Sequence, residues 1–368
     1  MRVKKQRVGE ETAMTEEIET RIQKMDRSSL RREDFFKAAE ILRNGGLVAF
    51  PTETVYGLGG NALDTGAAAR IYAAKGRPSD NPLIVHIADR EAVVRLASEV
   101  PEEAWKLAER FWPGPLTIIL KKSELVPDGT TGGLSTVAIR MPSDEIAVAL
   151  IRESGLYIAA PSANASGRPS TTRAEHVYQD LAGRIPLILD GGPVNIGLES
   201  TIIDLTAGVP MILRPGYISM EQLQDVLPNA VYDRAAVSRT ADSGIVAKAP
   251  GMKYRHYAPK GKLIIYEGDQ ESVVRAINEE TKKQCADGRR VAVLAAEETR
   301  ECYICENVKS AGSRRDEETI AANLFELLRE FDEEGAELIY SESFETVQLG
   351  QAIMNRLLKA AGYHIVRV

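Results

Sequence analysis

A strand that runs directly into hydroxyls, a carboxylate and glycines constrains this chain more than any other feature of its sequence. The apolar run LVAF at 47–50 predicts a buried strand, and the segment PTETVYGLG follows it at 51–59. Polar groups at a strand end, beside glycines that let a ligand approach the backbone closely, are typical of binding sites in α/β proteins. An ordinary strand and turn has the same pattern, so the meaning of this segment depends on two clusters downstream.

The first downstream cluster is KGRPS at 75–79, which places two cations one residue apart beside a glycine. In an extended segment the side chains of Lys75 and Arg77 point in the same direction, so both could reach one anion. Arginine offers phosphate a planar fork, and lysine offers it a point charge. A pair of solvated surface charges is the alternative interpretation.

The second downstream cluster is PSANASGRPS at 161–170, which follows an apolar strand and is rich in small hydroxyl and amide side chains. Such a loop can present backbone N–H groups and hydroxyls to phosphate oxygens, although a plain turn-rich loop has the same composition. The sequence has no GxxxxGKS or GxxxxGKT motif, so this loop is not a Walker phosphate loop.

Two arginines stand at predicted strand ends, Arg140 before Met-Pro and Arg214 before Pro-Gly. The segment ESTIID at 199–204 adds a carboxylate and two hydroxyls at a strand entrance. An arginine at a strand end can anchor a carboxylate ligand, although structural ion pairs use the same geometry. His86 lies in an apolar strand, where a histidine packed in the core is the default interpretation.

Strands and helices alternate regularly in the last third of the chain, which predicts a small doubly wound, Rossmann-like parallel sheet at 260–368. Residues 33–217 predict a larger mixed α/β domain with many strands and one long helix at 93–111. An alanine-, serine- and glycine-rich stretch lies between them, which predicts a linker or lid at 218–259. Residues 1–32 would form an N-terminal extension and a first strand. The predicted fold class is therefore α/β, with two domains.

Composition narrows the class of protein. The net charge of −7 and the pI of about 5.4 argue against a broad nucleic-acid surface, although they leave room for a small basic pocket for one nucleotide. The sparse, odd set of cysteines favours a reducing cytoplasm over a disulfide framework. The CxxC formed by Cys302 and Cys305 lacks the further ligands of a structural zinc site. No apolar run approaches the ~20 residues of a membrane span, and no apolar stretch follows the basic N-terminus, so we expect a cytoplasmic protein.

Taken together, nine segments resemble the L-threonylcarbamoyladenylate synthase family, in its long two-domain form with a YrdC-like first domain. They occur in order over roughly residues 20–368, which makes the set far more specific than any one member. The resemblance implies a YrdC-like twisted mixed sheet with a concave cleft, followed by the Rossmann-like domain. The matching segments are PTETVYGL at 51–58, KGRP at 75–78 with NPL at 81–83, WPGPLT at 112–117, VAIRMP at 137–142, PSAN at 161–164, ESTI at 199–202, LRPG at 213–216, PGMKYRHYAP at 250–259 and AIMNR at 352–356.

The implied reaction joins L-threonine, bicarbonate and ATP into threonylcarbamoyl-AMP and pyrophosphate. The threonine amine would capture CO2 or bicarbonate as a carbamate, and a carbamate oxygen would attack the α-phosphorus of ATP, a transfer that needs mainly positioning and charge neutralisation. The product would pass to a separate tRNA threonylcarbamoyl transferase complex, which forms N6-threonylcarbamoyladenosine beside the anticodon. The implied partners are thus small molecules and this complex, with at most a weak contact to tRNA and none to a membrane.

The resemblance also implies roles for individual residues. Lys75 and Arg77 would be the catalytic cations that hold the triphosphate of ATP, and Tyr254 would close over the nucleotide as a lid. Mg²⁺ would enter with ATP, bound by phosphates and water rather than by a protein cage, so no metal-ligating residue is expected. The other ATP contacts would be Ser79, Thr136, Ser162, Asn164, Ser170 and Arg214. The L-threonine contacts would be Thr52, His86, Ser200 and Arg140, the last on the carboxylate.

Two other functions compete with this one. A YrdC-like domain is concave and could hold RNA without catalysis, although the acidic pI argues against such a module. The carbamoyl-transfer branch of hydrogenase maturation carries a similar domain, but its proteins also carry paired CxxC zinc motifs, which this sequence lacks. Pyrophosphate release from ATP would separate the synthase from the binding module.

Overall fold

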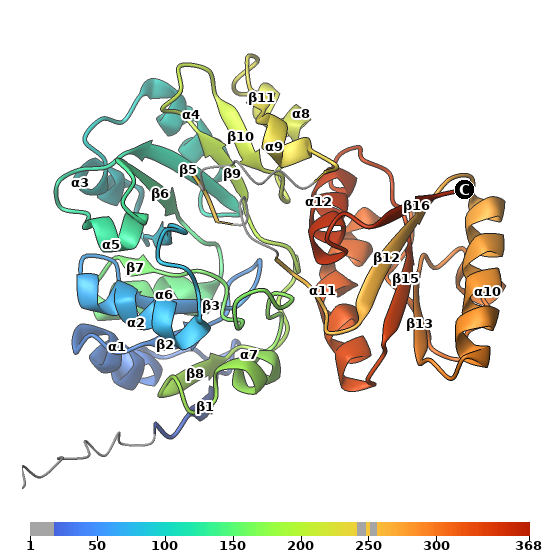
Figure 1. Ribbon diagram of the computed structural model, residues 1–368. Coiled ribbons are helices and arrows are strands. Elements are labelled where there is room, and N and C mark those ends of the chain that lie inside the picture. Colours follow the sequence, from blue (N-terminus) through green and yellow to red (C-terminus); the bar gives the residue numbers. More distant parts are fainter. Residues whose placement is uncertain (1–17, 241–247, 251–255) are drawn as a thin grey trace, which may run out of the picture.

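Two β-sheets, each with its own helices, make up the part of the chain that the computed structural model describes, which is residues 18–240, 248–250 and 256–368 (Figure 1). The first sheet is mixed, and the second is entirely parallel. We call the first sheet with its helices the first domain, and the second sheet with helices α10 to α12 the second domain. The predicted α/β class with a second parallel-sheet domain is confirmed. No helix among the described residues is long and apolar enough to cross a membrane.

The first domain is built on an eleven-stranded sheet with the order β1-β8-β2-β3-β7-β4-β6-β5-β9-β10-β11. Its inner strands are short and mostly apolar, and residues on both faces are buried, as expected for a sheet covered on two sides. The strands are β1 (Arg21–Lys24), β2 (Val48–Phe50), β3 (Gly57–Asn61), β4 (Ile84–His86), β5 (Leu116–Lys121), β6 (Thr136–Arg140), β7 (Ile158–Ala159), β8 (Leu187–Asp190), β9 (Thr201–Asp204), β10 (Met211–Arg214) and β11 (Val231–Tyr232).

The helices of the first domain differ from the prediction between residues 93 and 111, and two short helices were not predicted, one at Asp128–Thr131 and one at Arg234–Val237, inside the predicted linker. The single helix predicted at 93–111 is two helices, because Ala97 adopts extended angles (φ −106°, ψ 142°) and Pro101 caps the start of the second one. The α-helices are α1 (Phe36–Arg43), α2 (Thr65–Lys75), α3 (Val93–Leu96), α4 (Glu102–Phe111), α5 (Asp128–Thr131), α6 (Glu145–Ser154), α7 (Ala174–Leu181), α8 (Met220–Gln224) and α9 (Arg234–Val237), with 3₁₀ turns at Arg32–Phe35 and Arg90–Ala92.

The glycines of the opening segment, whose pattern is typical of binding sites, lie in a central strand, β3. A Cβ at Gly59 would lie 2.7 Å from the ring of Phe50 and 2.8 Å from the side chain of Ile158, so this glycine makes room for core packing. Gly57, in contrast, lines the cavity described below. Only part of this glycine pattern therefore serves the site.

The second domain is the predicted doubly wound unit, with the strand order β14-β13-β15-β12-β16. Helices α11 and α12 lie between its sheet and the first domain, and α10 covers the opposite face (Figure 1). Two of its strands, β14 and β16, were not predicted. Its elements are β12 (Lys262–Glu267), α10 (Gln270–Ala286), β13 (Val291–Ala295), a 3₁₀ turn (Arg300–Cys302), β14 (Val308–Ser310), α11 (Glu317–Glu333), β15 (Leu338–Glu342), α12 (Gly350–Ala360) and β16 (Ile365–Arg367).

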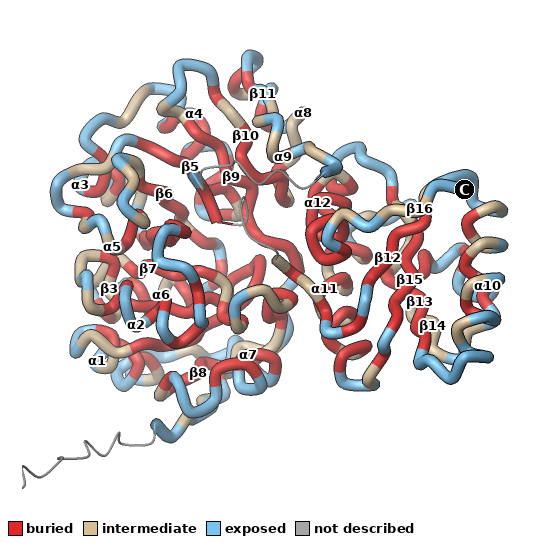
Figure 2. Tube along the Cα trace, in the orientation of Figure 1, coloured by how far each residue is buried: buried red, intermediate tan, exposed pale blue. Residues whose placement is uncertain are grey.

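The two domains share a hydrophobic core. Val55 and Leu198 of the first domain belong to the same buried cluster as residues of α11 and α12, and Figure 2 shows buried residues concentrated along α12. Gly197 allows a close backbone approach at this boundary, because a Cβ there would lie 2.5 Å from the carbonyl oxygen of Ala321 on α11. The second domain is thus packed against the first through apolar side chains.

Candidate active site

Strand ends of the first sheet bring the predicted site residues together. In the parallel pair of β4 and β6, His86 lies opposite Arg140, and in the antiparallel pair of β9 and β10, Ile202 lies opposite Arg214. Several of these strands therefore end at one edge of the sheet, where the loop after β7 joins them through a bridge between Gly57 and Ser162. A cavity lies at this edge. The predicted residues that line it are Thr52, Lys75, Arg77, His86, Arg140, Ser162, Asn164, Ser200 and Arg214.

Three predicted residues among those described do not line the cavity. Ser79 is exposed on the loop after α2, and Thr136 begins β6, at the opposite end of that strand from Arg140. Ser170 is fully buried and contacts the cavity wall indirectly, by donating its hydroxyl hydrogen to Glu199. Tyr254, the predicted lid residue, falls outside the described residues. The ATP contacts expected of Ser79 and Thr136 therefore find no support in the cavity lining.

Lys75 and Arg77 are held by a helix end and not by an extended segment, which corrects the interpretation from sequence. Lys75 is the last residue of α2, and Gly76 caps the helix with a left-handed φ of 62°, a conformation that glycine adopts without strain. Both side chains turn into the cavity, and both are buried, so they are not a solvated surface pair. Lys75 Nζ donates to the carbonyl oxygens of Ser162 and Asn164.

Burial disfavours the charged forms of these two groups. Desolvation, together with the neighbouring charge of Arg77, holds the pKa of Lys75 well below its usual value. Desolvation likewise lowers the pKa of Arg77 to about 10. Arg77 donates to the carbonyl oxygens of Asn81 and Pro82, at 3.3 and 3.1 Å. Because carbonyl dipoles compensate a full charge only in part, an anion in the cavity would be favoured electrostatically.

Arg140 stands in a polar frame made by the segment after β2. Its Nη1 donates to Thr54 Oγ1 at 2.9 Å, and its Nη2 lies 2.8 Å from Glu53 Oε1. The hydroxyls of Thr52 and Thr54 are 2.8 Å apart, which extends this frame along the cavity wall. Beside them, burial and the charge of Arg140 lower the pKa of His86 to about 3, so its imidazole is neutral.

Arg214 and Glu199 form the opposite wall. Arg214 donates to the carbonyl oxygen of Ser200 at 3.0 Å and to its hydroxyl at 3.2 Å, and burial lowers the pKa of this arginine to about 10. Burial opposes ionisation of Glu199, but Arg356 and Arg214 outweigh it and lower the pKa of the carboxyl group. Glu199 accepts a 3.0 Å hydrogen bond from Nε of Arg356, which belongs to α12 of the second domain.

The sequence reasoning assigned no role to several cavity residues. Thr54, Glu199, His256 and Tyr257 lie in segments that were quoted as motifs, which was the only signal for them. Tyr257 is buried at a left-handed φ of 65° and stacks on Phe325 of the second domain, with ring centroids 5.1 Å apart. Burial also holds the pKa of His256 well below its usual value. The cavity is therefore completed by residues that directly precede the second domain.

The charges around the cavity define the ligand that it suits. Among the described residues that line it, Lys75, Arg77, Arg140 and Arg214 are cationic, and Glu199 is the one carboxylate. A concentration of cations inside an acidic protein suits a polyanion together with a carboxylate. In the described parts of the chain, no group of three or more His, Cys, Asp or Glu side chains is placed to hold a metal ion.

The mixed sheet, the second domain and this cation-lined cavity define an enzyme that acts on small anionic substrates. Residues 40–216 match the family described as telomere recombination, and residues 218–362 match the family described as threonylcarbamoyl-AMP synthase, C-terminal domain. The chain belongs to the threonylcarbamoyl-AMP synthase family, which confirms the resemblance found in the sequence.

Individual relatives cover nearly the whole chain. The chain is 51% identical to the threonylcarbamoyl-AMP synthase of Pyrococcus abyssi, over 90% of this chain and 95% of that protein. It is 51% identical to the enzyme of Bacillus subtilis, over 90% of this chain and 94% of that protein. The crystal structure of Pyrococcus abyssi Sua5 complexed with L-threonine superposes with a TM-score of 0.87 at 49% identity, over 95% of this chain and 99% of that chain.

Proposed function

We propose that this protein forms threonylcarbamoyl-AMP and pyrophosphate from L-threonine, bicarbonate and ATP. The observation that carries the proposal is the convergence of four buried cationic side chains on one cavity, in a chain with a net charge of −7. A surface that binds RNA would instead have its cationic side chains spread over solvent-exposed positions. The names of the Pyrococcus abyssi and Bacillus subtilis relatives support the same activity.

One side of the cavity would take the nucleotide. Lys75, Arg77 and Arg214 would neutralise the triphosphate, and the loop with Ser162 and Asn164 would contact it beside Lys75. Mg²⁺ would enter with ATP, because phosphate oxygens and water satisfy most of its ligand positions. We retain Tyr254 and Ser170 as proposed contributors to this side, Tyr254 as a lid and Ser170 through Glu199.

The other side would take L-threonine, the ligand that the Pyrococcus abyssi crystal structure contains. Arg140 would bind the carboxylate of threonine, because its planar fork matches a carboxylate bidentately. The hydroxyls of Thr52, Thr54 and Ser200 would bind the polar groups of the substrate. The neutral ring of His86 would line the pocket without repelling the amine of threonine.

The chemistry needs position and charge more than a protein nucleophile. The neutral amine nitrogen of threonine bonds to the carbon of CO2 and loses a proton. Alternatively, it bonds to the carbon of bicarbonate, whose hydroxyl group leaves as water together with the amine proton. Both routes give a carbamate. A carbamate oxygen then attacks the α-phosphorus of ATP in line, the bond from that phosphorus to the bridging oxygen breaks, and pyrophosphate leaves with the electron pair. Buried cations stabilise the charge that develops on the phosphates. The product would then pass to the tRNA threonylcarbamoyl transferase complex.

Pyrophosphate release tests the proposal. The purified chain is incubated with ATP, Mg²⁺ and bicarbonate, with and without L-threonine, and D-threonine serves as the matched control. We expect release that requires L-threonine and bicarbonate. Release without threonine, or no release from protein shown to be folded, would refute the synthase and favour the RNA-binding module.

A further inference from the structure

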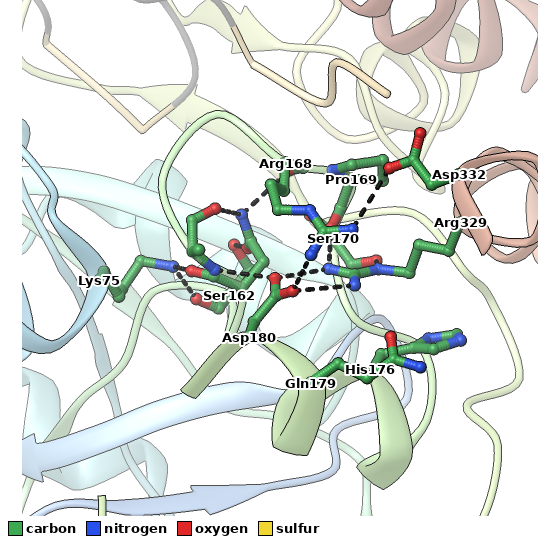
Figure 3. A network of polar contacts seen from close by, with 12 residues as sticks. Lys75, Ser162, Arg168, Pro169, Ser170, His176, Gln179, Asp180, Arg329 and Asp332 are labelled. Carbon is green, nitrogen blue, oxygen red and sulfur yellow. Dashed lines mark hydrogen bonds and ion pairs between the residues drawn. The ribbon is translucent and has the colours of Figure 1, made fainter. Parts of the chain in front are cut away.

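Arg329 of the second domain directs all its described hydrogen bonds to the first domain. It lies on α11 and is only 1% exposed. Its guanidinium forms two hydrogen bonds with the carboxylate of Asp180 on α7, from Nη1 at 3.2 Å and from Nη2 at 2.8 Å. It also donates to the carbonyl oxygens of Pro169 and Ser170 (Figure 3). One side chain of the second domain thus holds both a helix and a loop of the first.

The loop that Arg329 holds is the wall of the active-site cavity. Asp180 accepts a 2.9 Å hydrogen bond from the backbone N–H of Ala165 and a 2.6 Å hydrogen bond from Arg168, so it fixes the middle of the loop at 161–170. The same loop supplies the carbonyl oxygens of Ser162 and Asn164 to Lys75. Hydrogen bonds therefore connect Arg329 to Asp180, Asp180 to the peptide unit between Asn164 and Ala165, and this peptide unit to Lys75 (Figure 3).

Ser170 connects Arg329 to the opposite wall of the cavity. Its carbonyl oxygen accepts from Arg329 Nε at 3.3 Å, and its hydroxyl donates to Glu199. Glu199 in turn accepts from Arg356 of α12. The end of the loop is thus fixed between two arginines of the second domain, one on each side.

We infer that Arg329 is a positioning residue for the reaction, an inference that rests on the proposed function. By fixing the loop at 161–170 through Asp180, Pro169 and Ser170, it places the carbonyl oxygens that orient Lys75 toward the triphosphate. A bidentate arginine–carboxylate pair sets distance and direction together. A buried ion pair adds little net stability over apolar residues of the same volume, so a positioning role explains this pair better than a stabilising one.

The test compares steady-state kinetics of Arg329→Gln with those of a neighbouring control. Arg173, directly before α7, and Glu326 on α11 also form an ion pair across this boundary, 2.6 Å apart, and neither residue lines the cavity. Glu326→Gln therefore weakens the same boundary without touching the loop. We expect Arg329→Gln to raise KM for ATP at least about tenfold and KM for L-threonine less than about twofold, and Glu326→Gln to change neither. Arg329→Lys, which keeps the charge but not the fork, should recover part of the loss.

The outcomes separate positioning from folding. Loss of folded protein lowers the rate per total protein and leaves KM unchanged, so a selective rise in KM for ATP is not a folding effect. If Arg329→Gln does not fold, KM for ATP is measured instead for Asp180→Asn, which keeps the shape of the side chain. Folded variants whose KM for ATP stays within about twofold of wild type would overturn the inference. Wild-type protein without threonine-dependent pyrophosphate release would overturn the proposed function instead, and the inference with it.

Discussion

Glu53 and Arg140 face each other across 2.8 Å with their side chains only 9% and 4% exposed. The nitrogen and the oxygen of this contact are not aligned as a hydrogen bond, so the attraction is mainly electrostatic. Arg140 also donates to Thr54 and to the carbonyl oxygen of Gly114, which fixes the plane of its guanidinium. Arg140, the proposed anchor for the carboxylate of threonine, is thus held by Thr54 and Gly114 beside the opposite charge of Glu53.

Removal of that acid should make the protein depend on threonine for stability. Glu53→Gln leaves the guanidinium of Arg140 buried without a counter-charge, and breaking a buried pair in this way costs about 3–5 kcal/mol. We expect a lower melting temperature, and a larger increase on addition of L-threonine than in wild type, because the ligand carboxylate replaces the lost charge. Threoninamide, which has no carboxylate, is the control. Equal threonine-induced shifts in variant and wild type would contradict this role of Arg140.

Lys75 should be essential for the reaction and dispensable for the fold. Lys75→Met removes the charge and keeps most of the volume, so we expect kcat/KM for ATP to fall by ~10²-fold or more, as when a preorganised charge is lost. The carbonyls of Ser162 and Asn164 lose a donor, but the protein no longer has to desolvate an ammonium group. The melting temperature should therefore stay within about 5 °C of wild type. Lys106→Met, at an exposed lysine on α4, is the control and should change neither quantity.

The sequence predicts strands and helices well where the hydrophobic pattern and the glycines or prolines that end an element indicate the same boundaries. Apolar runs and flanking glycines predict a strand at 116–121 and a helix at 65–75, and these are the bounds of β5 and α2. The prediction of one long helix at 93–111 was wrong, because Pro101 interrupts the helical pattern. The interpretation of the opening glycines as part of a binding site was wrong for Gly59, because core packing in β3 leaves no room for a side chain there. The sequence leaves open whether Lys75 and Arg77 are solvated surface charges, whereas the end of their helix turns both side chains into the cavity, where they are buried.

The site was predictable as a set of segments but not as a set of contacts. Thr52, Arg140 and Arg214 lie at strand ends, which are local features that a sequence displays. Arg329 is a charged residue within an amphipathic helix, and nothing local distinguishes it from a solvated one. Arg356 belongs to the matching segment AIMNR, but the segment alone does not indicate what this arginine contacts. Their partners lie 149 and 157 residues away in the chain. Contacts of that range depend on how the two domains pack, which no local pattern reports.

Lys359 should make stability rise with pH above neutrality. Burial, and then the charge of Arg356, lowers the pKa of this lysine on α12 to about 7. The unfolded chain keeps the proton up to about pH 10.4, so between these values the unfolded state binds more protons and the folded state gains stability as pH rises, by at most about 1.4 kcal/mol per pH unit. Urea unfolding of wild type and Lys359→Met at about pH 7 and 9 measures this slope. Equal slopes in the two proteins would contradict the prediction, whereas we expect a smaller slope in the variant.

Gly197 should be the glycine whose replacement loosens the domain boundary. Gly197 and Gly208 have nearly the same left-handed φ, 79° and 78°, so replacement by alanine causes similar backbone strain at both positions. A Cβ at Gly197 would lie 2.5 Å from the carbonyl oxygen of Ala321 on α11, whereas a Cβ at Gly208 meets nothing within 4 Å. Gly197→Ala should therefore lose about 1–3 kcal/mol more unfolding free energy than Gly208→Ala.

The same pair of variants connects the boundary to the reaction, because α11 also carries Arg329. An alanine that pushes α11 away from the first domain should shift the guanidinium from Asp180 and raise KM for ATP, whereas Gly208→Ala should leave it unchanged. Denaturant unfolding and steady-state kinetics on the two proteins measure both effects. If Gly197→Ala lowers stability but leaves KM for ATP at the wild-type value, the two domains can separate slightly without disturbing the loop at 161–170, and the path from α11 to Lys75 does not operate as inferred.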